Sequence, residues 1–158
     1  MGWRSDRYRQ AMEPGDVDVR NVTYGQIPVL GRVPTSDETA ALLGVSVEAV
    51  QATWRRLHDD HAIVLDVAAA EIRMAHPFSA VPTPFRVRTA DGDWYANCGW
   101  DAFGICAALD ADGEIATSCP DCGDPIRCAV RDEAPDDQTL LFHCLVPAVA
   151  WWDDIVFT

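Results

Sequence analysis

Apolar residues recur at helical spacing in the first half of the chain. Four of them lie three or four positions apart and predict a helix over residues 47–58 with one buried face: Val47, Val50, Trp54 and Leu57. Ahead of this helix, Thr35 and Glu38 have the spacing of a capping box, and Gly44 ends the apolar stretch that they open. Two helices joined by so short a turn predict a helix-turn-helix.

Strand-like patterns follow these helices. Residues 63–65 and 71–75 predict a hairpin, which completes a winged-helix-like module over residues 35–76. An apolar run over residues 99–109 predicts one central helix in the second half of the chain. Around it, apolar or alternating runs predict further strands at 85–89, 94–97, 114–118, 126–130, 140–146 and 155–158.

The order of these elements defines the expected fold class. Helices come first and strands with a single helix come later, which is typical of an α+β fold. We expect a winged-helix-like helical module followed by a mixed or antiparallel β-sheet core over residues 77–158. Residues 1–34 contain Pro14, Gly15 and Pro28, and we expect an N-terminal arm and an irregular lead-in there.

The composition narrows the classes of function. Hydrophobic residues make up 49% of the 158, which suits a globular protein. The net charge of −13 argues against a nucleic-acid partner, because binding to phosphate requires a basic surface. Apolar runs fall short of the roughly 18 residues of a membrane span, and the basic N-terminus lacks the apolar core of a secretory signal. We therefore expect a cytoplasmic protein with no membrane partner.

Cysteine chemistry is concentrated in the last part of the chain. All six cysteines lie beyond residue 97, and without a secretory signal they indicate metal or thiol chemistry more than disulfides. Cys98 stands where the strand 94–97 runs into the helix 99–109, and Asp101 follows on the same helical face. A helix N-terminus favours a thiolate, the form that attacks and binds soft metals. Asp101 is placed to hold or donate a proton beside it.

The segment 94–101, which reads W-Y-A-N-C-G-W-D, resembles the core of the organomercurial lyases, the alkylmercury lyase (MerB) family. The resemblance runs from about Val64 to the C-terminus, and it implies an enzyme that splits a carbon–mercury bond by protonation. It implies that Cys98 is the first catalytic thiolate and Asp101 the proton relay. It also implies an organomercurial substrate, no required cofactor, and mercuric reductase as the acceptor of Hg(II).

The family's second catalytic cysteine is not found by this match. Where the chain reads W-W-D-D-I-V-F-T, that cysteine would come directly after Thr158. The chain is then expected to be truncated, to end at a codon read as stop, or to use another thiol such as Cys144 or Cys106. Cys106 lies deeper in the apolar helix and is expected to pack. Cys144, and Trp100 as a wall around the organic group, are the expected substrate-binding residues.

The turn at residues 119–123, C-P-D-C-G, has the spacing of a metal knuckle. Cys119 and Cys122 are therefore candidate metal ligands. They are expected either in a structural zinc site, completed by Cys128, His143 or Cys144, or as receivers of Hg(II) after cleavage. An inert turn is the alternative.

Two other functions remain open at this point. One is a non-catalytic, thiol-based protein that binds or senses a metal through its winged helix, and sensing requires a basic face on the second helix of that module. The other is an inactive, truncated homologue.

Overall fold

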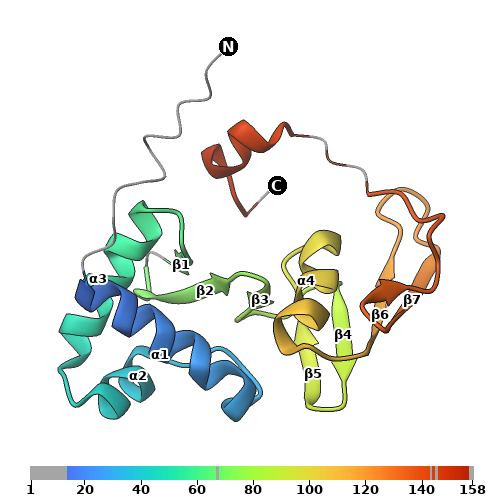
Figure 1. Ribbon diagram of the computed structural model, residues 1–158. Coiled ribbons are helices and arrows are strands. Elements are labelled where there is room, and N and C mark those ends of the chain that lie inside the picture. The colour runs from blue at the N-terminus through green and yellow to red at the C-terminus, as the bar shows by residue number, and fades with distance from the viewer. Residues whose placement is uncertain (1–13, 67, 143, 145, 157–158) are drawn as a thin grey trace.

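The computed structural model describes residues 14–66, 68–142, 144 and 146–156. It shows a helical module with a three-stranded sheet beside a five-stranded sheet that carries one helix (Figure 1). All strand pairs that it describes are antiparallel. The expected α+β class is therefore confirmed. None of the helices in this part of the chain is long and apolar enough to cross a membrane.

Three helices form the helical module and pack on one another: α1 (Pro14–Leu30), α2 (Ser36–Leu43) and α3 (Val47–Asp59). The predicted capping box between Thr35 and Glu38 begins α2, and Gly44 ends it with a left-handed φ of 68°. Trp54 of α3 is fully buried, and its indole N–H donates to the Thr23 hydroxyl of α1 at 3.1 Å. The predicted pair of helices is present and α1 covers it.

Helix α1 corrects the expectation of an irregular lead-in. Pro14 stands at the first helical position, where a missing N–H leaves no bond unmade. Pro28 lies inside the last turn of α1, but the neighbouring Ile27 is fully buried in the core. Tertiary packing of one face therefore outweighs the helix-breaking tendency of the proline. The expected arm, residues 1–13, lies outside the described residues.

The three-stranded sheet joins the helical module to the rest of the molecule. Its strands are β1 (Val64–Asp66), β2 (Glu71–Ala75) and β3 (Phe78–Ser79). β1 and β2 form the predicted hairpin, whereas β3 was not expected. Glu71 of β2 accepts a hydrogen bond of 2.9 Å from the Ser36 backbone N–H at the start of α2. Phe78 of β3 forms a bridge with Ala96, which lies just before the central helix.

The five-stranded sheet has the order β5-β4-β6-β7-β8. Its strands are β4 (Arg86–Thr89), β5 (Gly92–Tyr95), β6 (Gly113–Ser118), β7 (Pro125–Arg131) and β8 (Ala134–Pro135). The predicted helix is α4 (Gly99–Leu109), which packs on β4 and β6. Cys106 of α4 is 2% exposed and packs as expected. Its sulfur lies 2.7 Å from the position that a Cβ at Gly113 would occupy, so α4 rests directly on β6.

The predicted strands at 140–146 and 155–158 are wrong for the residues that the structure describes there. Residues 140–142 and 144 are in no strand, Leu141 is 93% exposed, and residues 155 and 156 form a turn. A 3₁₀-helix, η2 (Ala148–Asp153), lies between these segments. An apolar run without alternation does not distinguish a buried strand from an irregular segment.

Candidate functional site

Cys98 is the residue at which α4 begins. The bridge at Ala96 fixes the chain just before it, and an extended backbone (φ −149°, ψ −178°) makes Cys98 the N-cap. Its side chain is half-buried and lies near the backbone N–H groups of Trp100 and Asp101 on the first turn of α4.

The environment of the Cys98 sulfur favours the thiol over the thiolate. Burial is the largest influence and raises the pKa of Cys98 above its ordinary value. The backbone N–H groups of Asp101 and Trp100 act in the opposite direction, while the charge of Asp101 raises the pKa further. The expectation that the helix start makes Cys98 a thiolate is therefore wrong in its net effect. The effect of the Asp101 charge on this pKa indicates that the carboxylate lies close to the Cys98 sulfur.

Asp101 is held by two neighbours. Its Oδ2 accepts a hydrogen bond of 3.0 Å from Asn97 Nδ2 and lies 3.5 Å from Nδ1 of His76, and the side chain is 13% exposed. The Asn97 amide also donates to the Pro77 carbonyl at 3.3 Å. The Asp101 carboxylate is therefore fixed in orientation near Cys98, and the His76 imidazole lies next to it.

Sequence reasoning missed His76 and Asn97. Asn97 directly precedes Cys98 and lies four residues before Asp101, a spacing that allows contact at a helix start. His76 meets Asp101 only because β3 and β5 bring their chain segments together through the bridge between Phe78 and Ala96. That contact depends on tertiary structure and leaves no local signal in the sequence.

The helical module also borders the site. Tyr24 of α1 has a raised pKa, mainly because it is buried; Arg20 acts against the rise and the charge of Asp101 adds to it. Trp152 of η2 stacks on His61, with ring centroids 4.1 Å apart, and its ring centroid lies 6.3 Å from that of His76. Groups from both halves of the molecule therefore gather on the Asp101 side of α4.

The segment before η2 passes over the start of α4. The Phe142 ring lies 3.6 Å from the position that a Cβ at Gly99 would take, and 6.2 Å from the Trp100 ring between centroids. Cys144 is exposed, yet it is close enough to Cys98 to raise the pKa of that thiol by its charge. Trp100 is 68% exposed and is therefore no part of the core.

The other predicted metal ligands lie elsewhere. Cys119 and Cys122 stand together at the turn between β6 and β7. Cys128 is buried on β7, where its sulfur lies 3.4 Å from Asp136 Oδ1. Among the described residues, no three His, Cys, Asp or Glu side chains gather to hold a metal ion. The predicted structural zinc site therefore finds no support, and His143 lies outside the described residues.

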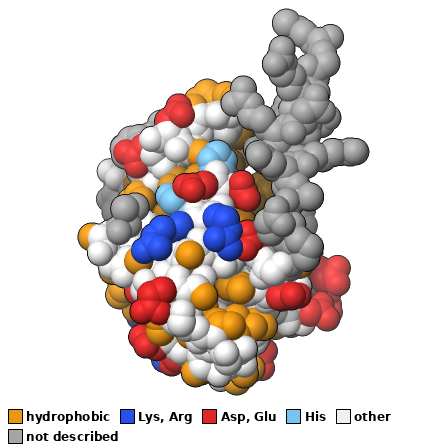
Figure 2. All heavy atoms as spheres, turned by 90° about the vertical axis from the view of Figure 1, so that its left-hand side faces the viewer, with side chains coloured by type: hydrophobic (Ala, Val, Ile, Leu, Met, Phe, Trp, Pro, Cys, Tyr) orange, Lys and Arg blue, Asp and Glu red, His pale blue; other side chains and the backbone are white. Residues whose placement is uncertain are grey.

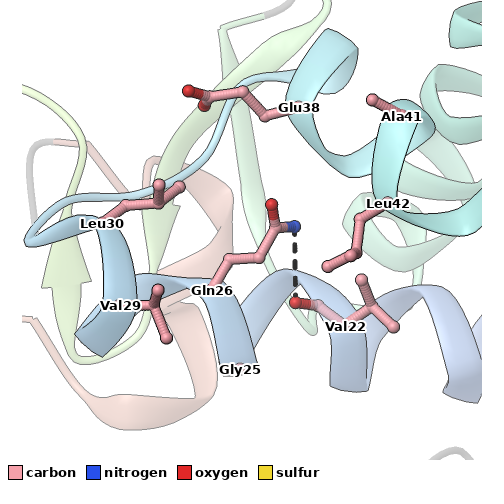
Figure 3. Close-up of a pocket in the computed structure, with 8 residues that line it drawn as sticks. All are labelled: Val22, Gly25, Gln26, Val29, Leu30, Glu38, Ala41 and Leu42. Carbon is pink, nitrogen blue, oxygen red and sulfur yellow. Dashed lines mark hydrogen bonds between the residues drawn. The ribbon is translucent and has the colours of Figure 1, made fainter.

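A groove in the helical module is separate from this chemistry. It has a volume of about 660 Å³ and lies between α1 and α2. Figure 3 shows the apolar side chains of Val22, Val29 and Leu42 along it, and the Gln26 amide that donates to the Val22 carbonyl at 3.4 Å. The groove offers no nucleophile or metal ligand beyond the carboxylate of Glu38, which is bound to Arg32.

The second helix of the module, α3, presents mixed charge. Arg56 donates to the Asp16 carboxylate at 2.6 and 2.9 Å, which lowers the pKa of Asp16. Exposed Asp59 and Asp60 follow at the end of the helix. Figure 2, which views this side of the molecule, shows basic and acidic side chains interspersed. This distribution does not supply the basic face that a nucleic-acid-binding sensor requires.

Comparison with known proteins identifies a family for this chain. The profile of the MerB alkylmercury lyase family matches residues 78–158, which include Cys98 and Asp101. Among solved structures, the crystal structure of the mercury-bound form of MerB2 has a TM-score of 0.66 and 21% sequence identity, and the match covers 85% of this chain and 66% of that chain. A search of curated proteins gave no match.

The fold and the site define an α+β protein with a thiol and a carboxyl at one helix start. The chain belongs to the alkylmercury lyase family. It spans about two thirds of the length of the solved relative, whose similarity supports the shared fold.

Proposed function

We propose that this protein is an organomercurial lyase-like enzyme that cleaves carbon–mercury bonds by protonolysis, giving R–H and Hg(II). The observation that carries the proposal is the pairing of Cys98 with Asp101 on the first turn of α4, within the segment that matches the family. A sulfur ligand suits a soft metal, and a carboxyl group held beside it can carry a proton to carbon.

In the proposed reaction, the proton that the thiol loses is the proton that the carbon gains. The cation R–Hg⁺ displaces the thiol proton of Cys98 and forms a sulfur–mercury bond, and Asp101 takes up that proton. Asp101 then delivers it to the carbon as the carbon–mercury bond breaks, and the electron pair of that bond forms the new C–H bond. Burial favours this order, because it raises the pKa of Cys98 and keeps the thiol protonated until mercury binds.

The neighbours of Asp101 have supporting roles in this scheme. The Asn97 amide donates to one carboxylate oxygen of Asp101 and so fixes the orientation of that side chain. His76 exchanges protons between Asp101 and solvent, because its ring lies 3.5 Å from the carboxylate and its side chain is 32% exposed. The roles of Asn97 and His76 are both inferred from the contacts that these residues make with Asp101.

A second thiol would weaken the carbon–mercury bond by raising the coordination of mercury. Cys144 is the proposed second ligand, because its segment lies over the start of α4 near Cys98. Trp100 and Phe142 would cover the organic group and exclude water from it. Mercuric reductase remains the proposed acceptor of Hg(II), and the cleavage needs no further cofactor.

We further propose that α1, α2, α3 and the β1–β2 hairpin act as a winged-helix-like scaffold and not as a nucleic-acid reader. The mixed charge of α3 supports this role. So does the contact between His61, just after α3, and Trp152 of η2, which places the module beside the proposed site.

Benzene release from phenylmercury acetate tests the proposed activity. The full chain is expected to release benzene, Cys98→Ser to release none, and Cys106→Ala to retain activity in its folded fraction because Cys106 only packs. Binding of phenylmercury without any benzene release by the unsubstituted chain would contradict the proposal. It would favour the alternative, a non-catalytic thiol protein that binds a metal.

A further inference from the structure

The β6–β7 turn holds two thiols in contact, away from Cys98. The Cys119 N–H donates to the Asp124 carbonyl at 2.8 Å, and the Gly123 N–H donates to the Cys119 carbonyl at 2.9 Å. Gly123 has a φ of +78°, a left-handed conformation that glycine adopts without strain. This closed turn brings Cys119 and Cys122 next to each other, close enough for the Cys122 thiol to influence the pKa of Cys119.

The turn lowers the pKa of one of its two thiols. The backbone N–H groups of Cys122 and Asp121 and the neighbouring Cys122 thiol lower the pKa of Cys119, in contrast to Cys98 and Cys106, where burial raises it. Independently of that shift, two sulfur atoms at Cys-x-x-Cys spacing on a closed turn can both reach one metal ion.

The turn lies at the same end of the sheet as the proposed catalytic thiol. In the strand register, Tyr95 of β5 pairs with Arg86 of β4, and Arg86 pairs with Ala116 of β6. Both β5 and β6 run antiparallel to β4, so they leave the sheet in the same direction. Cys98 comes three residues after Tyr95, and Cys119 comes three residues after Ala116. Two strand spacings separate β5 from β6, roughly 10 Å.

We propose that Cys119 and Cys122 form a two-sulfur site for Hg(II), and that this site receives the ion released at Cys98. Among the described residues no third ligand joins the pair, which suits an ion that two soft thiolates satisfy and does not suit zinc, which takes four ligands in a structural site. Binding is a ligand exchange without redox change: two sulfur–mercury bonds form at the turn, the bond between mercury and the Cys98 sulfur breaks, and of the two protons lost by Cys119 and Cys122 one returns to the Cys98 sulfur and the other goes to solvent. The origin of the ion at Cys98 rests on the proposed lyase function, whereas the site itself does not.

Retention of inorganic Hg(II) tests the site on the full-length Cys98→Ser chain, in which the proposed catalytic thiol is absent. One equivalent of mercuric chloride is added, and the protein is dialysed against a monothiol that competes for the ion. The retained mercury should lie between two sulfurs by X-ray absorption and should protect Cys119 and Cys122 from alkylation together. Cys119→Ser and Cys122→Ser, added singly, should each weaken retention by about tenfold or more, because the second thiolate then no longer binds intramolecularly.

Cys106→Ala is the control, because Cys106 is a thiol that lies outside the turn and packs in the core. It should leave retention unchanged in the same Cys98→Ser background. Equal retention after Cys122→Ser, or protection of other cysteines in place of Cys119 and Cys122, would overturn the site. Binding of Zn(II) in preference to Hg(II) under the same competition would overturn the choice of metal.

Transfer is tested separately in the unsubstituted chain with phenylmercury acetate. After benzene release, mass mapping should find Hg(II) bridging Cys119 and Cys122. Benzene release with mercury left at Cys98 would overturn the transfer while sustaining the lyase function. Absence of benzene release together with inorganic Hg(II) at the turn would contradict the lyase function and sustain the site.

Discussion

At the scale of single residues, the pKa values of Cys98 and Cys119 are shifted in opposite directions. Burial and the nearby Asp101 carboxylate raise the pKa of Cys98, whereas backbone N–H groups of the exposed β6–β7 turn lower the pKa of Cys119. The sequence places both cysteines at local features that favour thiolates. It did not indicate that burial reverses the effect at Cys98, because burial depends on the segments that fold over the start of α4.

These environments predict an order of alkylation by iodoacetamide at pH 7. Cys119 should react before Cys98, because more of it is thiolate, and Cys98 before Cys106, which is 2% exposed. Since the pKa of Cys98 is raised, its rate should go on increasing with pH above the range in which an ordinary thiol levels off. Peptide mass mapping over a pH series measures all three rates. Labelling of Cys106 ahead of Cys98 would be inconsistent with the structure.

His76 gives a second prediction at this scale. His76→Gln should lower kcat for benzene release by about tenfold and change the pH profile, with little effect on KM, because it acts on proton exchange and not on mercury binding. His58→Gln is the matched control, since His58 also lies near Trp152 but its ring nitrogen contacts the Ile63 carbonyl. An unchanged pH profile in His76→Gln would remove the proposed role.

At the scale of elements, the sequence predicted the helices and strands whose ends are defined by nearby residues in the chain. The capping box of α2, the extent of α3 and the strands β6 and β7 were all predicted within one or two residues. Prolines led to a wrong prediction for residues 14–30, where packing of Ile27 maintains the helix. In the apolar run that begins at residue 140, Phe142 packs against the start of α4 and Leu141 is 93% exposed, an arrangement that the run of apolar residues does not distinguish from a strand.

The contact between α4 and β6 gives a prediction for stability. Gly113→Ala should destabilise the protein by about 1 to 3 kcal/mol, because the new Cβ would lie 2.7 Å from the Cys106 sulfur and 3.2 Å from the Arg88 carbonyl oxygen. Adding Cys106→Ala should recover part of that loss, as a double-mutant cycle measured by urea unfolding would show. Gly25→Ala is the control, because among the described residues no atom outside its own stretch of helix lies within 4 Å of its Cβ position, and it should be neutral or stabilising. A fully stable Gly113→Ala protein would contradict the packing.

The ion pair between α1 and α3 predicts a pH dependence. Asp16 is 4% exposed, and the hydrogen bond from Arg56 lowers its pKa below the ordinary value of 3.8. Because the folded pKa is depressed, this stabilisation is present above pH 3.8 and is lost as the pH falls through the lower, folded value. Asp16→Asn should cost about 1 to 2 kcal/mol at pH 7 and should flatten the acid side of the stability curve. Urea unfolding at pH 7 and pH 3 measures both effects, and equal losses at the two pH values would contradict this account.

At the scale of the whole molecule, the candidate site is assembled from both halves. Cys98 and Asp101 come from one helix start, and the sequence was sufficient to predict that they lie near each other there. His76, Tyr24 and Trp152 come from segments that only the fold brings together, so the sequence carried no signal for their grouping. The pairing of Cys119 with Cys122 was predictable from their spacing, whereas their position at the same sheet end as Cys98 required the strand register.

The central claim is that Cys98 captures mercury and Asp101 delivers the proton that breaks the carbon bond. The most direct test is to compare phenylmercury binding with benzene release in Asp101→Asn. Asparagine keeps the shape of the side chain but cannot carry the proton, so binding should be unchanged while the release rate falls by about 10² to 10⁴. Benzene release at the unsubstituted rate by Asp101→Asn, with phenylmercury bound to the same extent, would contradict the account.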